Sequence, residues 1–219
     1  MSKEMKNGKI MAATQNGSII IAGLKCQTDF LSKSELFSDA LAKICSLLIT
    51  GKSKEVRPLI DQLKIDSKEE IELLCTSKID SHLGNPVSYY LHHDKRKAAV
   101  VQFIIDNDNT KIIAHREDID ELGKILSMHV VAFDPAHLSM NEVNWNNVDL
   151  EIPEKMKDKP ANILEKIAKG KKEKYGKEHV FLKQPYVKDL KTTVGQVIDK
   201  FNKEYDLNIK IEDYCRMEV

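Results

Sequence analysis

The feature that most constrains the fold is an apolar run that stands directly behind a tight-turn signal. Asn16-Gly17 is the pair favoured by two-residue β-hairpin turns, in which both positions need a positive φ angle. The run at residues 19–24 follows and contains no charged residue. Such a strand is typical of a central position in a sheet, covered on both faces. A β-hairpin is therefore predicted over residues 9–25, with its second strand inside the protein.

A polar loop and a helix follow this hairpin. Apolar residues recur at helical spacing and predict a helix from about Glu35 to Thr50, which Gly51 is placed to end. Ser32 and Glu35 have the spacing of a capping box at its start. Two shorter helices are predicted at residues 53–63 and 67–76, and residues 67–70 have the pattern of a second capping box.

The same order of hairpin, polar loop and helix occurs a second time. Residues 87–105 predict a hairpin with its turn at residues 94–97. Residues 118–133 predict an amphipathic helix, which Asp134-Pro135 ends. The predicted fold class is therefore α+β: two related subdomains, each an antiparallel sheet with helices packed on one face.

The subdomains are expected at residues 1–80 and 81–140. Residues 141–159 are polar and aperiodic, and we interpret them as a connection to residues 160–219, whose helices and strand complete the core. Within that last part we expect a helix that Pro160 opens and Gly176 closes, a short strand at residues 179–182, a helix capped by Thr192 or Thr193, and a final strand from Leu207 to Met217.

The charge balance argues against a general nucleic-acid-binding protein. Lys plus Arg and Asp plus Glu number 34 each, whereas such proteins usually carry a basic excess. The helix that begins at Pro160 has lysines on its outer face, from Lys166 to Lys174. Such a face is usually only solvated, and a nucleic-acid role is the lesser alternative.

Several other classes are disfavoured. The four cysteines are scattered without a C-x-x-C pair, so neither zinc nor a disulfide framework is indicated, and reduced thiols in the cytosol are expected. The first residues lack the apolar segment of a secretory signal, and no apolar run approaches membrane-spanning length. A glycine-rich phosphate loop and a nucleophile with its base are also missing, so neither an enzyme nor a cofactor or metal site is predicted.

Three histidines need separate interpretation. His92 and His93 are adjacent in the second hairpin, and neighbouring strand residues point to opposite faces, so the two imidazoles are expected to diverge rather than share a metal. His129 lies near the apolar face of its helix and, taken alone, is expected to be a core or edge histidine. By default, a protein-binding role is favoured over catalysis.

The loop between the first hairpin and its helix contains Asp29-Phe30, an unusual place for a phenylalanine. An exposed ring forgoes roughly 1.5–3 kcal/mol of burial. Composition alone therefore favours a Phe30 that folds back as the first core contact of the helix. The alternative is that Phe30 is a wedge for a partner, with Asp29 as a charge carried beside it.

Five stretches, in order along the chain, together resemble the elongation factor Ts family. They are Cys26-Gln27-Thr28-Asp29-Phe30, Tyr90-Leu91-His92-His93 leading to Arg96, Ser127–Ala132 followed by Pro135, Gln184–Asp189 followed by Thr192–Gln196, and the closing Cys215–Val219. Each motif alone is modest, but in register they are specific and span the chain from about Lys9 onward. The resemblance lacks the family's small N-terminal helical domain, and the family's projecting helical hairpin is expected to be shortened to residues 141–159.

The resemblance implies a guanine-nucleotide exchange factor for elongation factor Tu in translation elongation, not an enzyme. The loop at Asp29-Phe30 would enter the partner's GTPase domain near its Mg²⁺ and phosphate site and release GDP. The implied partner-contacting residues are Thr28, Asp29, Phe30, His92, His129, Gln184, Pro185 and Tyr186. No direct nucleotide binding, no cofactor and no membrane are expected. The location implied is the bacterial cytosol or an organelle matrix, and a homo-oligomer is compatible with the sequence.

Two alternatives stay open at this point. One is a paralogue that binds elongation factor Tu without releasing its nucleotide. The other is an RNA-associated binding protein that uses the lysine face, whose affinity would fall steeply with salt.

Overall fold

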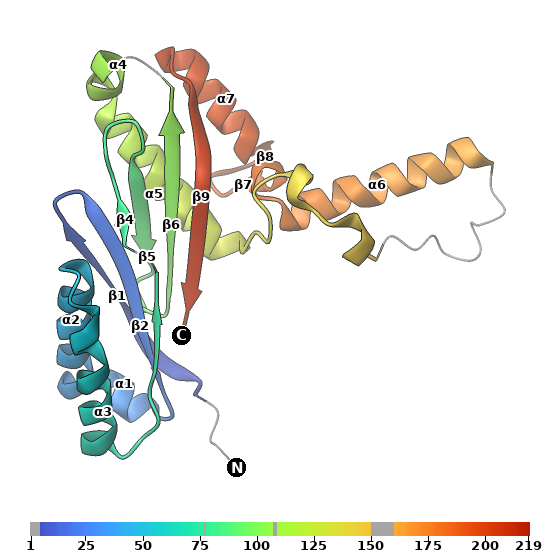
Figure 1. Cartoon of the computed structure of the whole chain (residues 1–219). Coiled ribbons are helices and arrows are strands. Elements are labelled where there is room, and N and C mark those ends of the chain that lie inside the picture. Colours follow the sequence, from blue (N-terminus) through green and yellow to red (C-terminus); the bar gives the residue numbers. More distant parts are fainter. Residues whose placement is uncertain (1–4, 77, 107–108, 150–159) are drawn as a thin grey trace. The chain divides into compact units, whose positions relative to one another are not determined.

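The structure is a computed structural model that describes residues 5–76, 78–106, 109–149 and 160–219 (Figure 1). The chain forms two compact units. Residues 1–131 together with 207–219 make the first unit, and residues 132–206 make the second. The finer division at residues 80, 140 and 159 stays a prediction.

The first sheet of the first unit is built on the predicted hairpin. β1 (Asn7–Gln15) pairs antiparallel with β2 (Ser18–Cys26), and the turn between them has φ angles of 50° at Asn16 and 80° at Gly17. β3 (Glu72–Cys75) and the short β4 (Ile79–Asp80) both pair with the other edge of β2. The hairpin prediction is confirmed, and β2 is the central strand of its sheet.

Helices cover one face of this sheet. They are α1 (Asp29–Lys33), α2 (Glu35–Ile49), the 3-10 turn η1 (Ser53–Glu55) and α3 (Val56–Ser67). Phe37 and Leu41 of α2 and Ile60 of α3 join Leu24 of β2 in one buried cluster. The helix predicted from Glu35 is confirmed, but its cap is Ser34, whose hydroxyl accepts from the backbone N–H of Phe37 at 3.2 Å. The predicted Ser32–Glu35 box was wrong because Ser32 already belongs to α1 and is buried there.

The helix predicted at residues 67–76 was also wrong. α3 continues to Ser67, and Lys68 ends it in the left-handed region with φ at 58°. The chain then extends and pairs with β2 along Lys25–Ala22. The open edge of a buried central strand offers backbone hydrogen bonds to this segment, so tertiary pairing overrides the local capping pattern.

The second sheet has the order β5-β6-β9. β5 (Val87–Leu91) and β6 (Lys97–Ile105) form the second predicted hairpin, and β9 (Ile209–Glu218) pairs with β6 from the far end of the chain. α4 (Asn109–Ala114) and α5 (Arg116–Phe133) follow β6. α5 packs closely on the sheet, since Ser127 Oγ donates to the backbone oxygen of Ser88 at 3.2 Å.

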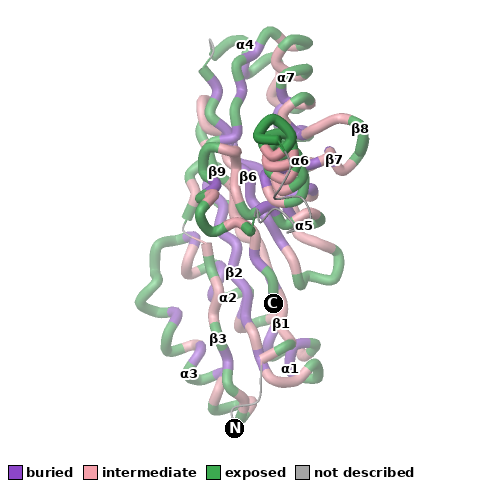
Figure 2. Tube along the Cα trace, turned by 90° about the vertical axis from the view of Figure 1, so that its right-hand side faces the viewer, coloured by how far each residue is buried: buried purple, intermediate pink, exposed green. Residues whose placement is uncertain are grey.

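The two sheets share a second core. Ile10, Ile19 and Ile21 of the first sheet pack with Val100 of β6 and Met217 of β9. β2 is therefore covered by helices on one face and by the second sheet on the other, and it is buried along almost its whole length (Figure 2). This explains its continuous apolar run. The predicted α+β class, with antiparallel sheets that each have helices on one face, is confirmed.

Where the structure describes it, the second unit consists of helices and a small hairpin. Its elements are the 3-10 turns η2 (Met140–Glu142), η3 (Trp145–Asn147) and η5 (Phe181–Lys183), the helices α6 (Ala161–His179) and α7 (Val194–Tyr205) and the strands β7 (Pro185–Tyr186) and β8 (Asp189–Thr193), beside the last residues of α5. Of the two predicted caps of α7, Thr193 is the one observed, and it forms a capping box with Gln196. Residues 150–159 of the predicted connection lie outside the described residues.

Two predictions in the second unit were wrong. Gly176 does not end α6. It is buried inside the helix, where a Cβ would come within 2.8 Å of Met140 Sδ, so the glycine serves close packing rather than termination. The strand predicted at residues 179–182 is instead the end of α6 followed by η5, because the amides of Val180 and Lys183 bond back to Gly176 and Val180.

Candidate functional site

The tip, defined as Gln27-Thr28-Asp29-Phe30, connects β2 to α1. Thr28 is the N-cap of α1, and its hydroxyl accepts from the backbone N–H of Leu31 at 3.2 Å. The next residues of α1, Leu31 and Ser32, are buried, whereas the Phe30 side chain faces solvent with 85% exposure. The expectation from composition that Phe30 folds into the core was therefore wrong. The ring projects into solvent because the opposite face of α1 is the one that packs against the protein.

Glu69 holds the tip from the side of β3. One carboxylate oxygen, Oε2, accepts from the backbone N–H groups of Gln27 and Thr28, each at 2.9 Å. The other, Oε1, accepts from the Thr28 hydroxyl at 2.5 Å. The hydroxyl of Thr28 thus donates to Glu69 while it accepts from Leu31, so both of its hydrogen-bonding functions are used.

Asn7 holds the tip from the side of β1. Its side-chain amide donates to the backbone oxygen of Gln27 at 3.0 Å. Below the tip, the thiol of Cys26 donates to the backbone oxygen of Thr28 at 3.2 Å. Burial raises the pKa of this thiol to about 11, helped by the negative charge of Glu69, so Cys26 stays a neutral donor at physiological pH. The backbone of the tip is bound on both sides and from beneath.

The charge beside the exposed ring is itself paired. Asp29 forms an ion pair with Lys33, one helical turn later, at 2.9 Å, and both side chains are exposed. The hydrogen bond from Lys33, together with its charge, lowers the pKa of Asp29 below its ordinary value. Asp29 is therefore a solvated carboxylate at neutral pH. It lies next to Phe30, which is exposed, whereas Phe37 of α2 is buried.

A polar hollow of about 330 Å³ lies beside the tip and reaches the turn of the second hairpin. Its walls come from the start of β1, from α1 and from that turn, and they include Lys9, Asp29, Lys33, Asp94 and Arg96. The turn is fixed to β1 because the backbone N–H of Ile10 donates to the oxygen of Lys95 at 2.6 Å. The fold therefore brings the second hairpin turn next to the first loop.

Arg96 ties this turn to distant parts of the first unit. Its guanidinium donates to the backbone oxygens of Val219, at 3.0 Å from Nη2, and Lys6, at 2.7 Å. The backbone N–H of Arg96 donates to Asp94 at 2.8 Å, and this bond is the main reason that the pKa of Asp94 lies below its ordinary value.

His92 lies in the same turn, where its Nδ1 is 3.0 Å from a carboxylate oxygen of Asp94. The rings of His92 and His93 lie side by side with centroids 4.2 Å apart, so the predicted divergence was wrong. β5 ends at Leu91, and the alternation of a strand no longer applies beyond that residue. Within the described ranges, no group of three or more His, Cys, Asp or Glu side chains is arranged to hold a metal ion.

The predicted contact residue His129 is fully buried on α5. Its side chain in this conformation belongs to the packing of the first unit, as expected from its position on the apolar face. A role for His129 toward a partner stays a prediction, and the exposed residues of the tip carry the candidate site.

Gln184, Pro185 and Tyr186 lie in the second unit. Gln184 is fully buried, and its side-chain amide donates to the backbone oxygens of Phe133 at 3.2 Å and Glu178 at 2.9 Å. Its own backbone oxygen accepts from Val194 at the start of α7. Pro185 and Tyr186 form β7, in which Tyr186 is buried. Gln184 thus connects three helix ends, and the partner role of this stretch stays a prediction.

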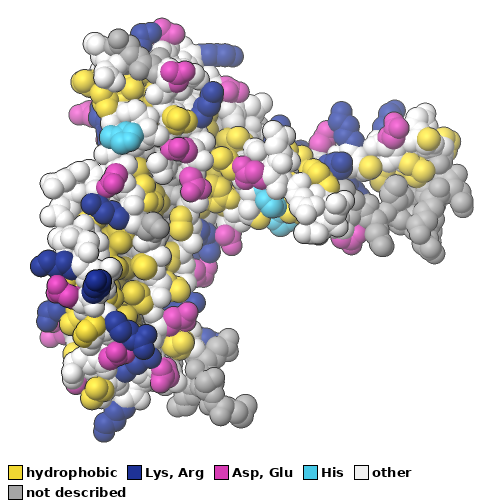
Figure 3. Space-filling model, viewed as in Figure 1, with side chains coloured by type: hydrophobic (Ala, Val, Ile, Leu, Met, Phe, Trp, Pro, Cys, Tyr) yellow, Lys and Arg dark blue, Asp and Glu magenta, His cyan; other side chains and the backbone are white. Residues whose placement is uncertain are grey.

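The lysine face of α6 carries mixed interactions. Lys172 stacks over the Trp145 ring, 5.0 Å from its centroid, and Lys174 pairs with Glu178 at 4.0 Å. In the first unit, the surface of α2 and α3 shows Lys and Arg interspersed with Asp and Glu (Figure 3). These arrangements, among the residues that the structure describes, fit a solvated charged surface.

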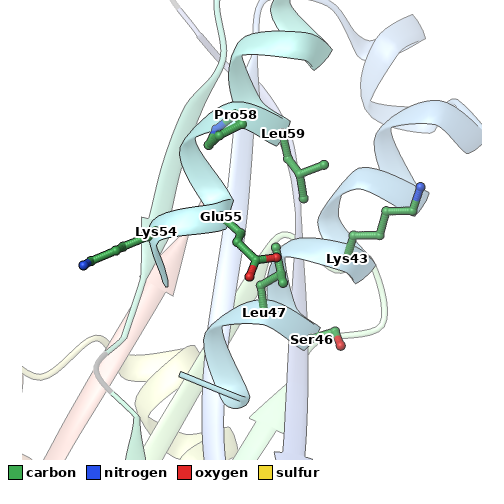
Figure 4. Close-up of a pocket in the computed structure, with 7 residues that line it drawn as sticks. All are labelled: Lys43, Ser46, Leu47, Lys54, Glu55, Pro58 and Leu59. Carbon is green, nitrogen blue, oxygen red and sulfur yellow. The ribbon is translucent and has the colours of Figure 1, made fainter. Parts of the chain in front are cut away.

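A wider groove lies between α2 and α3 in the first unit. It has a volume of about 630 Å³ and is lined by Leu47, Pro58 and Leu59, with Lys43 and Lys54 extending from its sides (Figure 4). Its apolar floor belongs to residues packed against the helix–sheet core. No group in it has the paired donors and acceptors found at the tip.

Glu69 and Asn7 are the site residues that sequence reasoning missed. Glu69 belongs to the capping box predicted at residues 67–70, and Asn7 precedes the predicted hairpin. The sequence holds a partial signal for Glu69: an acid between the end of a helix and an apolar stretch can accept hydrogen bonds from amides at the end of a neighbouring strand. The signal identifies no partner until the pairing of β3 with β2 is known, and no local pattern predicts that pairing.

The fold and this site define a class: an α+β protein of two packed antiparallel sheets that presents an exposed aromatic on a bound loop. The family model described as Elongation factor TS matches residues 27–219. Two relatives named Elongation factor Ts are those of Clostridium acetobutylicum, 26% identical over 90% of this chain and 69% of the relative, and Kineococcus radiotolerans, 30% identical over 90% and 74%. The Elongation factor Ts of Azobacteroides pseudotrichonymphae is 27% identical over 100% of this chain and 80% of its own length.

The chain belongs to the elongation factor Ts family. The match begins within the tip and continues through both units to the last residue. In the described parts of the chain, no helix combines the length and the apolar character needed to cross a membrane.

Proposed function

We propose that this protein is a guanine-nucleotide exchange factor for elongation factor Tu and that the tip performs the exchange step. Family membership supports the translation factor and its partner. The observation that supports the mechanism is the 85% exposed Phe30 on a loop bound from both sides. The factor makes and breaks no covalent bond, so it acts as a binding protein and not as an enzyme.

The exposed ring can contribute to binding through the hydrophobic effect. Burial of a phenylalanine side chain in an apolar pocket of the partner is favourable by roughly 1.5–3 kcal/mol. Entry between packed helices of the GTPase would move the elements that carry its Mg²⁺ ligands. Because Mg²⁺ demands near-ideal octahedral oxygen geometry, a small displacement weakens its hold, and the nucleotide phosphates lose their main counter-charge.

Asp29 contributes charge to the same step. Like any carboxyl group whose pKa is at or below the ordinary value, it is ionised at neutral pH, and it is brought to the partner together with Phe30. A carboxylate near the displaced ion's site competes for the waters and side chains around the ion. GDP and the exchange factor then each weaken the binding of the other by the same factor, as linkage requires.

The other predicted contacts support docking. His92 and Asp94 lie in the turn that shares the polar hollow with Asp29, so they would contact the partner beside the tip. Of the predicted contact residues in the second unit, Gln184 and Tyr186 are buried and Pro185 is partly exposed, so Pro185 would meet the partner there.

The test is the rate at which fluorescent GDP leaves elongation factor Tu. The wild-type protein is expected to accelerate release, and Phe30→Ala to reduce the acceleration by roughly tenfold or more, given the burial free energy of the ring. Ile65→Ala is the matched control, because Ile65 is a 69% exposed apolar residue of the same unit on α3. It is expected to leave the rate unchanged.

The other outcomes separate the alternatives. A complex without accelerated release would establish a non-catalytic binder of elongation factor Tu. Failure to form a complex would refute both roles. Binding to RNA that falls steeply with salt would favour the RNA-associated alternative.

A further inference from the structure

The contacts of Glu69 go beyond those of an ordinary surface acid. Its side chain bonds the two backbone amides and the hydroxyl that lead directly into Phe30. A carboxylate that accepts several hydrogen bonds forms charge-assisted bonds, which are shorter and stronger than neutral ones. The three bonds fix the orientation of the peptide planes before Asp29, and with them the direction in which α1 starts.

The position of Glu69 follows from the strand register. Lys25 of β2 lies opposite Glu72 of β3. Continuing this antiparallel register by three residues would place Glu69 opposite Thr28, beyond the end of the ladder. There the backbone of residue 69 is turning out of α3, and its side chain takes the place of the missing strand carbonyls. The amides of the tip are therefore satisfied although the sheet has ended.

We propose that Glu69 is a positioning residue for nucleotide exchange, which holds Phe30 in its projecting orientation before the partner arrives. This inference rests on the proposed function. A bound tip loses little conformational entropy when the ring inserts, whereas a free tip must be ordered at that moment. Glu69 touches neither nucleotide nor metal in this scheme and acts only through the tip.

The first experiment measures GDP release as a function of exchange-factor concentration. Glu69→Ala is expected to lower the maximal release rate by about tenfold, with little change in the concentration that gives half of the maximum, because the docking surface is intact. Glu69→Gln keeps the size of the side chain and one acceptor oxygen, and it is expected to lose about threefold. Glu72→Ala is the matched control, since Glu72 is an exposed acid three residues away on β3.

A double-mutant cycle distinguishes positioning from general stabilisation. If Glu69 acts through the ring, Glu69→Ala has no further effect on release in a Phe30→Ala background. A residue that merely supports the fold would lower the rate by the same factor in both backgrounds, and that result would overturn the inference.

Hydrogen–deuterium exchange of backbone amides, measured by NMR on the free protein, tests the hydrogen bonds between Glu69 and the tip without elongation factor Tu. The N–H groups of Gln27 and Thr28 are expected to exchange at least tenfold faster in Glu69→Ala, but not in Glu72→Ala. Unchanged protection in both Glu69 variants would overturn the inference even if exchange activity is present. If the wild-type protein fails to accelerate GDP release, the proposed function fails, and amide exchange alone decides whether Glu69 orders the tip. Glu69→Gln keeps the test valid if Glu69→Ala does not fold.

Discussion

The first unit has two halves, one built on the hairpin β1–β2 and the other on the hairpin β5–β6. They have the same order of elements, but they differ in the contacts that hold the chain where it leaves the sheet. In each half, a buried strand leads through a short helix into a long one: β2 to α1 and α2, and β6 to α4 and α5. Each short helix also exposes an apolar side chain, Phe30 at 85% on α1 and Ile113 at 63% on α4. Exposure alone therefore does not distinguish the candidate site from its counterpart.

The difference lies in what binds the chain after the strand. Beyond β2, side chains take over, from Asn7 on one side and Glu69 on the other. At the end of β6, backbone groups continue the pairing, from Ile105 to Gly84 at 2.8 Å and from Asp106 to Asn208 at 3.2 Å. A loop held by side chains is sensitive to single substitutions, whereas one held by backbone is not. The first half is organised to present a loop, and the second to hold a close-packed helix.

The largest expected effect tests the close packing of the second half. A Cβ at Gly123 of α5 would lie 2.2 Å from Ser88 Oγ and 2.6 Å from Ser88 Cβ. Gly123→Ala should therefore destabilise the protein by roughly 1–3 kcal/mol, despite the better helix propensity of alanine. Urea unfolding measures the change.

Gly170→Ala on α6 is the matched control for the glycine substitution. A Cβ there would meet nothing within 4 Å. It should stabilise by at most about 1 kcal/mol through helix propensity. Equal effects of the two substitutions would contradict the close approach of α5 to its sheet.

An intermediate effect is expected at Asn7. Asn7→Ala removes one neutral hydrogen bond to the tip, worth about 1 kcal/mol, against three bonds to a charged group at Glu69. GDP release should slow by a few fold, less than in Glu69→Ala. Asn85→Ala removes a side-chain bond to Glu212 in the second half and should leave release unchanged. If GDP release slows more in Asn7→Ala than in Glu69→Ala, Asn7 and not Glu69 is the more important contact of the tip.

The smallest effect is expected at the surface pair Asp29–Lys33. Lys33→Ala removes the hydrogen bond and charge that lower the pKa of Asp29, so this pKa should rise toward its ordinary value. Because the folded-state pKa is lowered, the pair's contribution is present above the ordinary carboxyl pKa and is lost as pH falls through the lowered one. At neutral pH that contribution is small because both groups are exposed, so the urea midpoint should fall only slightly.

NMR titration of the Asp29 carboxyl group measures this pKa. Arg116→Ala is the control, because it removes the equivalent pair with Asp120 on α5, at 3.0 Å. That variant should leave the pKa of Asp29 where it is, and a shift of similar size in both variants would refute the local cause.

The sequence predicted what local chemistry decides. The Asn16-Gly17 turn, the burial of β2 and the helix from Glu35 follow from positive φ angles, apolar continuity and helical spacing. Thr28, Asp29 and Phe30 were predicted as site residues from a family resemblance, while composition pointed to a buried Phe30.

What could not be predicted depends on register and on where elements end. The contact between Glu69 and Thr28 joins residues 41 positions apart and exists only because β3 pairs with β2. The adjacency of His92 and His93 depends on β5 ending at Leu91. The burial of Gly176 inside α6, rather than at its end, goes with the close approach of Met140 to that position. In the first and third cases a distant segment is in contact with the residue concerned, and in the second the exact end of a strand decides.

The discontinuity of the first unit has a consequence for synthesis on the ribosome. Met217 and Val219 belong to the core between the two sheets, and residues 132–206 intervene before β9 is made. Until β9 has left the ribosome, the inner faces of β1, β2 and β6 have no cover from it. The nascent chain must carry this apolar surface while the second unit is translated. Chaperone binding or slow folding is therefore expected at this stage. Truncation within β9 should give a chain that aggregates instead of a shorter folded protein.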